Sequence, residues 1–453
     1  MNLQCISERM VKRENFGSRL ALILAMAGSA IGLGNIWRFP YLVGQNGGAA
    51  FIIVYLISCF VLVLPIFMAE SIIGRRTRSS TFGAMKKLAP GTPWKWMGLL
   101  TVITPLLILG YYSVVGGWSL DYLWKACTLR LTHDTAGLFP SFISSTWEPL
   151  VAFTLFIVAT AVVILLGVKN GIEKFTKFCM PALFVLIVAI VIFGLTLPGS
   201  SEGVRYLVKP DFSKINASVV ASAMGQAFFS MSLGMGTILT YASYAPENEN
   251  IMTSGLGTAF ADLGFALLAG FAVMPAVFSA GIQPGEGPGL VFETLPYIFS
   301  QMPTWVGAIV SIVFFLTILM AALTSSISVL EVGVAYLVEE KGMGRVKSTV
   351  VITLLGWVLG VFCSLSFGPL SGATLFGLSI FDIMDKLCSD WLLPLGGLLF
   401  TLFVGWYMSK ADVRDEFTNN GTANVGIFNV IYFLMRYVAP LGILVVFITN
   451  LVL

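Results

Sequence analysis

The sequence predicts an all-α, polytopic membrane protein with about eleven transmembrane helices. Of its 453 residues, 57% are apolar and only 11% are charged, and the mean hydropathy is +0.90. A soluble domain carries about 25% charged residues, so this chain has too few charges to cover a surface that faces water. The same composition excludes a disordered, collagen-like or disulfide-rich secreted protein. Long apolar stretches and an uneven distribution of lysine and arginine support the membrane assignment.

The candidate spans are apolar stretches long enough to cross the hydrocarbon core of a bilayer, which takes about 18 residues or more. They lie at residues 18–43, 49–74, 95–124, 149–168, 178–197, 217–243, 254–282, 304–338, 349–368, 389–409 and 426–451.

The segments between the spans differ in character. Segment 370–386 is too mixed in composition to cross a membrane, so we expect a short outer helix there. Segments 136–145, 199–216 and 283–300 are expected to form larger outer loops. Residues 1–17 have no cleavable signal pattern and are expected to lead, in the cytoplasm, into the first span.

Lysine and arginine are distributed unevenly between the two sides of this layout. Arg38 and Arg436 lie within spans, and eighteen of the 26 basic residues lie on the side that carries the N-terminus. The other side holds only Lys125, Arg130, Arg205, Lys209, Lys214 and Lys386. Because cytoplasmic loops carry the excess of basic residues, we expect a multi-pass protein of the cell membrane with a cytoplasmic N-terminus. With eleven spans, its C-terminus would be extracellular.

The first and sixth spans are interrupted by glycines and polar residues. The first contains Gly28, Gly32 and Gly34, followed by Asn35 and Arg38, and the sixth contains Gly225, Ser230, Ser232, Gly234 and Gly236. Each begins a set of five spans, about 200 residues apart, and such a pair indicates a transporter built as an inverted repeat with a site near the bilayer midplane. A helix-packing GxxxG face is the alternative for Gly28 and Gly32.

The expected organisation is therefore a 5+5 inverted repeat with unwound first and sixth helices. Its parts are a cytoplasmic N-terminal segment (1–17), a first five-helix repeat (18–197), an extracellular loop (198–216), a second repeat (217–410) and an eleventh-span region (411–453).

The eighth span carries a stripe of small and hydroxyl-bearing residues. Ala321, Thr324, Ser325 and Ser328 fall on one face of a helix. The hydroxyls either bond back to carbonyls of their own helix or face the broken first span, where its freed carbonyls would complete an all-oxygen sodium site. Amides freed on the other side of that break suit a carboxylate.

Four acidic residues lie at membrane depth or at its edge. A charge at the bilayer centre costs roughly 3 kcal/mol on insertion scales, so each needs a partner or a function. Asp262 is the deepest and the best cation ligand, and Asp121 is expected to be solvated at the outer edge. Glu70 forms either an interfacial salt bridge or hydrogen bonds to loosened backbone, and the role of Glu331 is left open.

Cysteine and histidine give no sign of a metal or catalytic centre. The six cysteines are scattered without a CxxC pair and are expected to be packing residues, with a bridge between Cys127 and Cys388 as the alternative. The single histidine, His133, leaves no His-based metal site or catalytic dyad. No enzymatic activity, organic cofactor or nucleic-acid partner is expected.

Five segments of the sequence resemble a known family of transporters. The first span and its extension read GSAIGLGNIWRFPYLVGQNGGAAF, and later segments read YYSVVGGWSL, KNGIEKFTKFCMP, GQAFFSMSLGMGTILTYASY and FFLTILMAALTSSIS. Together they resemble the neurotransmitter:sodium symporter family over nearly the whole chain. Within that family the resemblance is greatest to bacterial carriers of many hydrophobic amino acids.

The resemblance implies two sodium ions and an amino acid substrate. One sodium would be held by Ala30, Asn35, Ser230 and Asp262 together with the substrate carboxylate. The second would be held by Gly28, Ile31, Ala321, Thr324 and Ser325. The substrate would contact Ala30, Leu33, Gly34, Ile108, Tyr112, Phe229, Ser230, Ser232, Met235, Ser325 and Val329.

Departures from the family pattern narrow the expected substrate. Monoamine carriers have an aspartate where this chain has Gly32, so the substrate should bring its own carboxylate. Met235 replaces a phenylalanine, and its flexible side chain favours a broad range of apolar or aromatic substrates. Chloride-dependent members of the family need a negative charge near the first sodium. Asp262 occupies a position that is usually asparagine in the family, and Ala266 occupies one where the leucine carrier has a glutamate. We therefore expect Asp262 to provide the negative charge and make transport independent of chloride.

The resemblance also implies gates on either side of the site. Arg38 and Asp390 would form the outer pair, and Arg13 and Glu339 the inner pair. Gly171 and Pro181 match a pattern in the fifth helix that would let it unwind. The expected function is sodium-coupled import of hydrophobic or aromatic L-amino acids by alternating access. An amino-acid-binding sensor or channel without coupled transport is the alternative.

Overall fold

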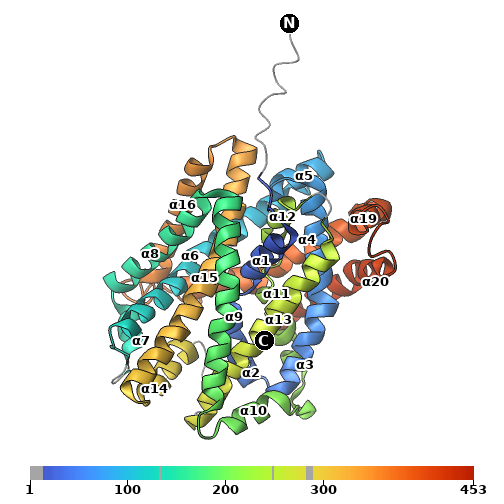
Figure 1. The fold of residues 1–453 in the computed structure, drawn as a ribbon. Helices are drawn as coiled ribbons and strands as arrows, with labels where there is room; N and C mark the ends of the chain where they lie inside the picture. The colour runs from blue at the N-terminus through green and yellow to red at the C-terminus, as the bar shows by residue number, and fades with distance from the viewer. Residues whose placement is uncertain (1–13, 132–134, 136, 247–248, 282–288, 453) are drawn as a thin grey trace.

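The computed structural model describes residues 14–131, 135, 137–246, 249–281 and 289–452. Within these ranges every regular element is a helix, apart from one isolated bridge between Leu375 and Leu378 (Figure 1). The all-α fold class is therefore confirmed.

The first five expected spans are all helical, and several contain a π-helical turn. They are formed by α1 (Arg19–Ala30), η1 (Gly34–Arg38) and α2 (Phe39–Gln45); α3 (Ala49–Ser58), η2 (Cys59–Val63) and α4 (Leu64–Thr77); α6 (Lys95–Cys127); α8 (Trp147–Leu165); and η3 (Val168–Glu173) with α9 (Lys174–Leu195).

The remaining spans follow the same pattern. They are formed by α11 (Ala217–Ser230) and α12 (Thr237–Ser243); α13 (Ile251–Ser279); α15 (Thr304–Lys341); α16 (Arg345–Leu365); α17 (Ile380–Lys386), η6 (Leu387–Leu392), α18 (Leu393–Leu402) and η7 (Phe403–Tyr407); and α20 (Phe428–Phe433), η8 (Leu434–Val438) and α21 (Ala439–Val452).

The span count agrees with the prediction once broken helices are joined. In the described ranges, 9 helices are long and apolar enough to cross a membrane, and the pair α1 and η1–α2, bent by 51°, makes a tenth. Neither α11 nor α12 is long enough alone, but together they cover the sixth expected span.

The connections alternate between two ends of the bundle. We call the end that carries residue 14, α5 (Thr81–Leu88) and α19 (Lys410–Phe417) the N-terminal face, and the other end the opposite face (Figure 1). The opposite face carries short helices within all three expected outer loops. They are α7 (Leu138–Ser144), α10 (Ser200–Val208), η4 (Phe212–Lys214), η5 (Leu290–Thr294) and α14 (Leu295–Ser300).

The expectation for segment 370–386 is wrong in one respect. Its helical part, α17, is not a separate outer helix but continues through η6 and α18, so the tenth span begins at Ile380. A reciprocal capping box starts the helix here, because the Ser379 side chain accepts from the Asp382 amide and the Asp382 carboxylate from the Ser379 amide. This local signal lies outside the apolar run from which the span was predicted.

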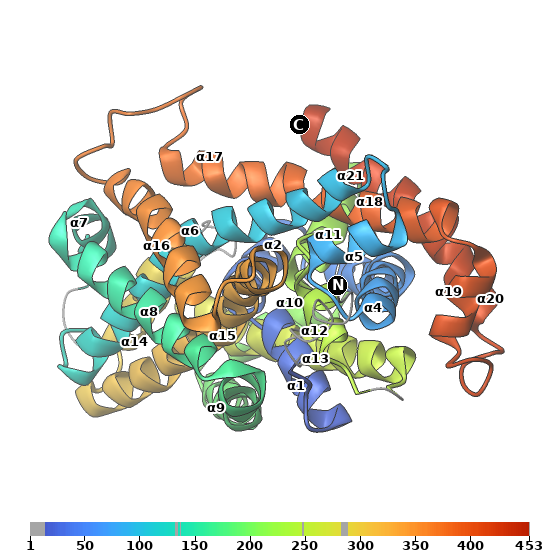
Figure 2. The ribbon, with the colours of Figure 1, turned by 90° about the horizontal axis from the view of Figure 1, so that it is seen from above.

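Burial separates central helices from peripheral ones. The apolar window of α6 is 72% buried, whereas those of α8 and of Val168–Leu195 are 39% and 33% buried. Figure 2 shows α8, α9 and α16 along one side of the bundle, with α15 nearer its middle. Residues 25–36 of the broken first span and 324–335 of α15 are buried among the other helices.

Candidate functional site

The first span breaks where the sequence places its glycines. Helix α1 ends at Ala30, Ile31 leaves the helix in an extended conformation, and the helix resumes at Gly34. A Cβ at Gly32 would overlap the Ser325 hydroxyl and lie 2.7 Å from the Tyr112 hydroxyl oxygen. Glycine therefore leaves room at the break for the hydroxyls of Ser325 from α15 and Tyr112 from α6.

The sixth span breaks between Ser230 and Thr237. Gly234 and Gly236 have φ of +83° and +76°, the left-handed region that glycine adopts without strain. The buried Glu70 carboxylate accepts the Gly234 amide at 2.7 Å and the Leu239 amide at 3.4 Å. Of the two alternatives for Glu70, hydrogen bonding to loosened backbone is the one found.

A first cluster of oxygen atoms joins the first, sixth and seventh spans. The Asp262 Oδ1 accepts the Asn35 amide at 2.7 Å and the Ser230 hydroxyl at 2.8 Å. The Asn35 Oδ1 accepts the Gly32 amide at 3.0 Å, and Tyr55 donates to the second Asp262 oxygen at 3.5 Å. All these side chains are buried. Tyr55 was missed, since nothing in its apolar run marks it.

A second oxygen cluster joins the eighth span to the end of α1. The Ser325 hydroxyl lies 3.4 Å from the Gly28 carbonyl oxygen and 3.2 Å from that of Ile31. The Thr324 hydroxyl lies 2.9 Å from the Ala321 carbonyl oxygen and 3.5 Å from that of Ile31. The two alternatives for this hydroxyl stripe are both realised, because it bonds within its own helix and also faces the broken span.

Between the two clusters lies a small buried cavity of about 30 Å³. It brings together ten of the eleven expected substrate residues: Ala30, Gly34, Ile108, Tyr112, Phe229, Ser230, Ser232, Met235, Ser325 and Val329. The eleventh, Leu33, has its amide 3.3 Å from the Tyr112 hydroxyl. Ser29, Gly32 and Leu393 also line the cavity, and Leu393 was missed because the tenth span carries no polar residue at that depth. No lining residue is charged.

The expected outer gate residues lie beyond this cavity on the opposite face. Arg38 and Asp390 line a separate cavity of about 240 Å³. The Arg38 guanidinium also lies 4.8 Å from the centre of the Phe229 ring. Phe229 therefore stands between the two cavities.

The expected inner pair is described only in part, because Arg13 lies outside the described residues. The Glu339 carboxylate accepts the Ser80 amide at 2.5 Å. Phe16, three residues after Arg13 in the sequence, is buried and packs edge-on against Tyr241. Its backbone amide donates to the Tyr244 carbonyl at 3.0 Å.

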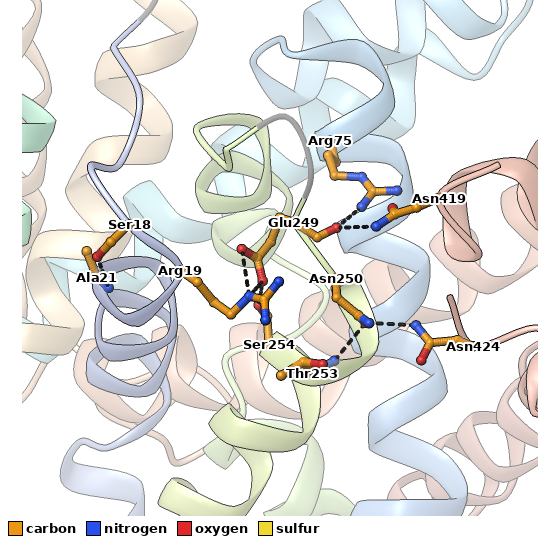
Figure 3. A network of polar contacts seen from close by, with 10 residues as sticks. All are labelled: Ser18, Arg19, Ala21, Arg75, Glu249, Asn250, Thr253, Ser254, Asn419 and Asn424. Atoms are coloured by element: carbon orange, nitrogen blue, oxygen red, sulfur yellow. Dashed lines mark hydrogen bonds and ion pairs between the residues drawn. The ribbon is translucent and has the colours of Figure 1, made fainter. Parts of the chain in front are cut away.

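A polar network that sequence reasoning missed joins several helices at the N-terminal face (Figure 3). The buried Glu249 carboxylate pairs with Arg19 at 3.1 Å and accepts the Ser254 hydroxyl at 2.6 Å. Its backbone carbonyl accepts Arg75 and, at 3.2 Å, Asn419. Glu249 thus ties α1 to α4, to α13 and to the chain after α19. Glu249 lies in a loop between two predicted spans, so a search for acidic residues within spans did not find it.

Glu331, whose role was left open, is a buried member of a second network. Its carboxylate pairs with Arg345 at 2.7 Å and accepts the Tyr244 hydroxyl at 2.8 Å. Arg345 also donates to the Ile164 carbonyl at 2.9 Å. The charge of Glu331 is therefore compensated within the bundle, by the first residue of α16.

The two residues expected to loosen the fifth helix lie in intact helix here. Gly171 is in the π-helical turn η3, and Pro181 is inside α9. A Cβ at Gly171 would overlap the Val163 carbonyl, so this glycine allows α8 and η3 to pack closely. The Gly17 amide donates to Glu173 at 2.8 Å, which fastens the N-terminal segment to the same turn.

One further expectation is wrong, and the alternative considered for two cysteines is not found. Cys127 and Cys388 are both free, the first exposed and the second buried, so no bridge joins them. Asp121 is not solvated, because it forms an ion pair with Lys125 at 2.5 Å and its side chain is only 15% exposed. His133 and Cys5 lie outside the described residues. In the described part of the chain, no group of three or more His, Cys, Asp or Glu residues is arranged to hold a metal ion.

Comparisons with known proteins agree with this geometry. A family model described as the "Sodium:neurotransmitter symporter family" matches residues 13–148 and 141–453. The chain is 39% identical, over 96% of its length and 97% of the relative's, to "Uncharacterized sodium-dependent transporter YhdH" of Bacillus subtilis. It is similar to the "Crystal structure of MhsT in complex with L-phenylalanine", with a TM-score of 0.89 and 42% identity over 96% of this chain and 99% of that one.

Proposed function

Because the chain belongs to the sodium:neurotransmitter symporter family and is a sodium-dependent transporter, we propose that it imports hydrophobic and aromatic L-amino acids by alternating access. The observation that carries this proposal is one cavity, free of charged side chains, at which two broken helices meet between two clusters of oxygen atoms. The amino acid bound in the similar solved structure supports the substrate class.

The oxygen clusters fit two co-transported sodium ions. Sodium is a hard cation that prefers oxygen ligands, as calcium does. The first site would use Asn35, Ser230, Asp262 and the Ala30 carbonyl, and the single carboxylate would offset the charge of the ion. The second would use the carbonyls of Gly28, Ile31 and Ala321 with the hydroxyls of Thr324 and Ser325. Each cluster includes backbone of the broken first span, so each ion would stabilise the same bend.

The cavity suits a zwitterionic amino acid. The amides of Leu33 and Gly34 begin the resumed helix, where amide groups and the helix dipole favour a carboxylate, and the Tyr112 hydroxyl lies 3.3 Å from the Leu33 amide. The ammonium would meet the carbonyls of Ala30, Phe229 and Ser230. An amine without a carboxylate would leave those amides and the sodium charge unpaired, which carries a large free-energy cost in a buried site.

The side-chain end of the cavity favours breadth rather than one substrate. Ile108, Phe229, Met235 and Val329 line it, and all but Phe229 are buried. Met235 has three rotatable bonds and a polarizable sulfur, so it can repack around ligands of different size. We therefore infer a range that covers leucine, phenylalanine and tryptophan.

Asp262 would make the transport independent of chloride. Its carboxylate is buried with Tyr55, Ser230 and Asn35, and it would provide the negative charge that a bound chloride provides in the chloride-dependent relatives. Ala266, one helical turn further along α13, is buried and leaves no second carboxylate beside it.

Orientation and gating complete the proposal. The excess of basic residues on the N-terminal face favours the cytoplasm for that face. Arg38 and Asp390 would close the opposite, extracellular face, and Glu339 with Arg13 the cytoplasmic one. Opening near Gly171 and Pro181 would then let water reach the second sodium.

Equilibrium binding of a ligand panel to the purified protein tests this assignment. Leucine, phenylalanine and tryptophan should bind in sodium and not in potassium, with no change when chloride is replaced by gluconate. Dopamine should bind at least about a hundredfold more weakly, because it lacks the carboxylate. Dopamine binding equal to that of phenylalanine would exclude the amino acid assignment. Binding without sodium would favour the sensor or channel.

A further inference from the structure

A large crevice lies on the opposite face, away from the proposed transport site. It has a volume of about 530 Å³ and lies between the ends of α6 and α8. Asp121 and Trp124 line it from α6, and Trp147, Glu148 and Val151 line it from α8. Figure 1 shows the α8 end beside α7, at the edge of the bundle.

The side chains around the crevice mark the level of a membrane interface. Trp124 and Trp147 are 62% and 72% exposed, although they are large aromatic residues. Tryptophan gathers at the headgroup level of a bilayer, where an apolar ring with one polar end is stable. From Trp147 an exposed apolar stripe runs along α8 through Val151, Leu155 and Val158. The crevice therefore joins a headgroup-level opening to a surface that faces acyl chains.

The charges in the crevice favour a cation. Lys125 is 2.5 Å from the Asp121 carboxylate and 3.8 Å from that of Glu148, so one ammonium faces two carboxylates. The Lys125 side chain is only 7% exposed and lies over the Phe142 ring, 4.1 Å from its centre. The Glu148 side chain is 63% exposed. A ligand can therefore reach the Glu148 carboxylate, whereas the Lys125 ammonium is covered by the protein.

We propose that this crevice is a binding site for an aminophospholipid such as phosphatidylethanolamine. The primary ammonium of the headgroup would pair with Glu148 between the faces of Trp124 and Trp147, which attract cations through their π-electrons. One acyl chain would lie along the Val151 and Leu155 stripe. Arg130 also acts on Asp121 and offsets part of the negative charge. An anionic headgroup without an ammonium would still bring its charge against the exposed Glu148 carboxylate.

Native mass spectrometry of the detergent-purified protein tests the proposal with three lipids of identical acyl chains. Phosphatidylethanolamine should be retained best, phosphatidylcholine less, because its ammonium donates no hydrogen bond, and phosphatidylglycerol least. Trp147→Ala should weaken phosphatidylethanolamine binding about fivefold, the size expected for one cation–π contact. Glu148→Gln should weaken it by a similar factor.

Two further variants make the result decisive. Glu148→Lys, at an exposed position that packing does not constrain, should reverse the preference in favour of phosphatidylglycerol. Trp305→Ala is the matched control, because Trp305 is also 72% exposed at the opposite face but does not line the crevice, and it should leave the lipid preference unchanged. Phosphatidylglycerol retention equal to that of phosphatidylethanolamine in the native protein would overturn the proposal. So would equal losses in Trp147→Ala and Trp305→Ala.

Discussion

At the scale of single residues, the proposed site depends on groups whose chemistry has little to do with formal charge. Asp262 is the one carboxylate in the two oxygen clusters, and the cavity lining has none. Carbonyls, amides and hydroxyls make up the rest. This is why composition alone, at 11% charged residues, points to a membrane but not to a site.

Replacing Asp262 by asparagine separates the charge of this residue from its size. Asp262→Asn keeps the hydrogen-bonding shape but removes a full charge from a buried site, so sodium affinity should fall about tenfold or more. Because a bound chloride can restore the lost charge, substrate binding should become stimulated by chloride. The measurement is sodium-dependent phenylalanine binding in chloride and in gluconate. Native-like, chloride-insensitive binding by this variant would show that Asp262 does not have this role.

Gly32→Ala tests the close approach of α15 and α6 to the broken span. The added methyl group would overlap the Ser325 hydroxyl and crowd that of Tyr112, so substrate binding should fall by at least about a hundredfold, and the free energy of unfolding should fall by about 1–3 kcal/mol. Gly225→Ala, at a glycine of the same broken pair of spans where a Cβ meets nothing within 4 Å, is the matched control and should bind normally. Equal binding by both variants would contradict this account of the cavity.

At the scale of elements, the sequence predicted the transmembrane helices and the two helices that are broken, but not the contacts between them. Long apolar runs located most spans to within a few residues, but the fifth and tenth begin about ten residues before the predicted starts, at Val168 and Ile380. The glycines at 32, 34, 234 and 236 indicated the two unwound helices. The contacts between elements were not predictable, because hydrogen bonds such as those of Tyr55 and Glu249 join segments about 200 residues apart in the sequence. The hydroxyl stripe of α15 illustrates the limit, since the sequence left two alternatives open and the structure contains both.

The Glu249 network is expected to keep the N-terminal face closed. Glu249→Gln keeps the side-chain size but removes the ion pair to Arg19. Because Arg19 is half exposed, the population of the open N-terminal face should rise only about two- to fivefold. Hydrogen exchange in α1 should rise by that factor. Asp412→Asn is the control, because Asp412 pairs with Arg76 between α19 and α4 and does not contact α1. Faster exchange in both variants would mean general loosening rather than a latch.

Opening of the fifth helix is best tested at Pro181 alone. Gly171→Ala would push against the Val163 carbonyl, so its effect would mix packing damage with any change in unwinding. Pro181→Ala restores a backbone donor within α9 and should slow hydrogen exchange in Val168–Leu195 and the release of sodium to the N-terminal face. Unchanged exchange in that segment would contradict the proposed route.

At the scale of the whole molecule, the account is that of a symporter in which sodium and substrate stabilise the same bend of the first span. Each ligand must therefore raise the affinity of the other by the same factor. Such coupling distinguishes a carrier from a sensor that binds the amino acid alone. The family assignment supports it, and the arrangement of two oxygen clusters around one cavity gives it a physical basis.

Uptake of labelled phenylalanine into proteoliposomes, with and without an inward sodium gradient, tests this central claim most directly. The account predicts accumulation above the outside concentration only while the sodium gradient lasts, abolished by Gly32→Ala and unaffected by replacement of chloride. Uptake that merely equilibrates, or that is the same in potassium and in sodium, would contradict it.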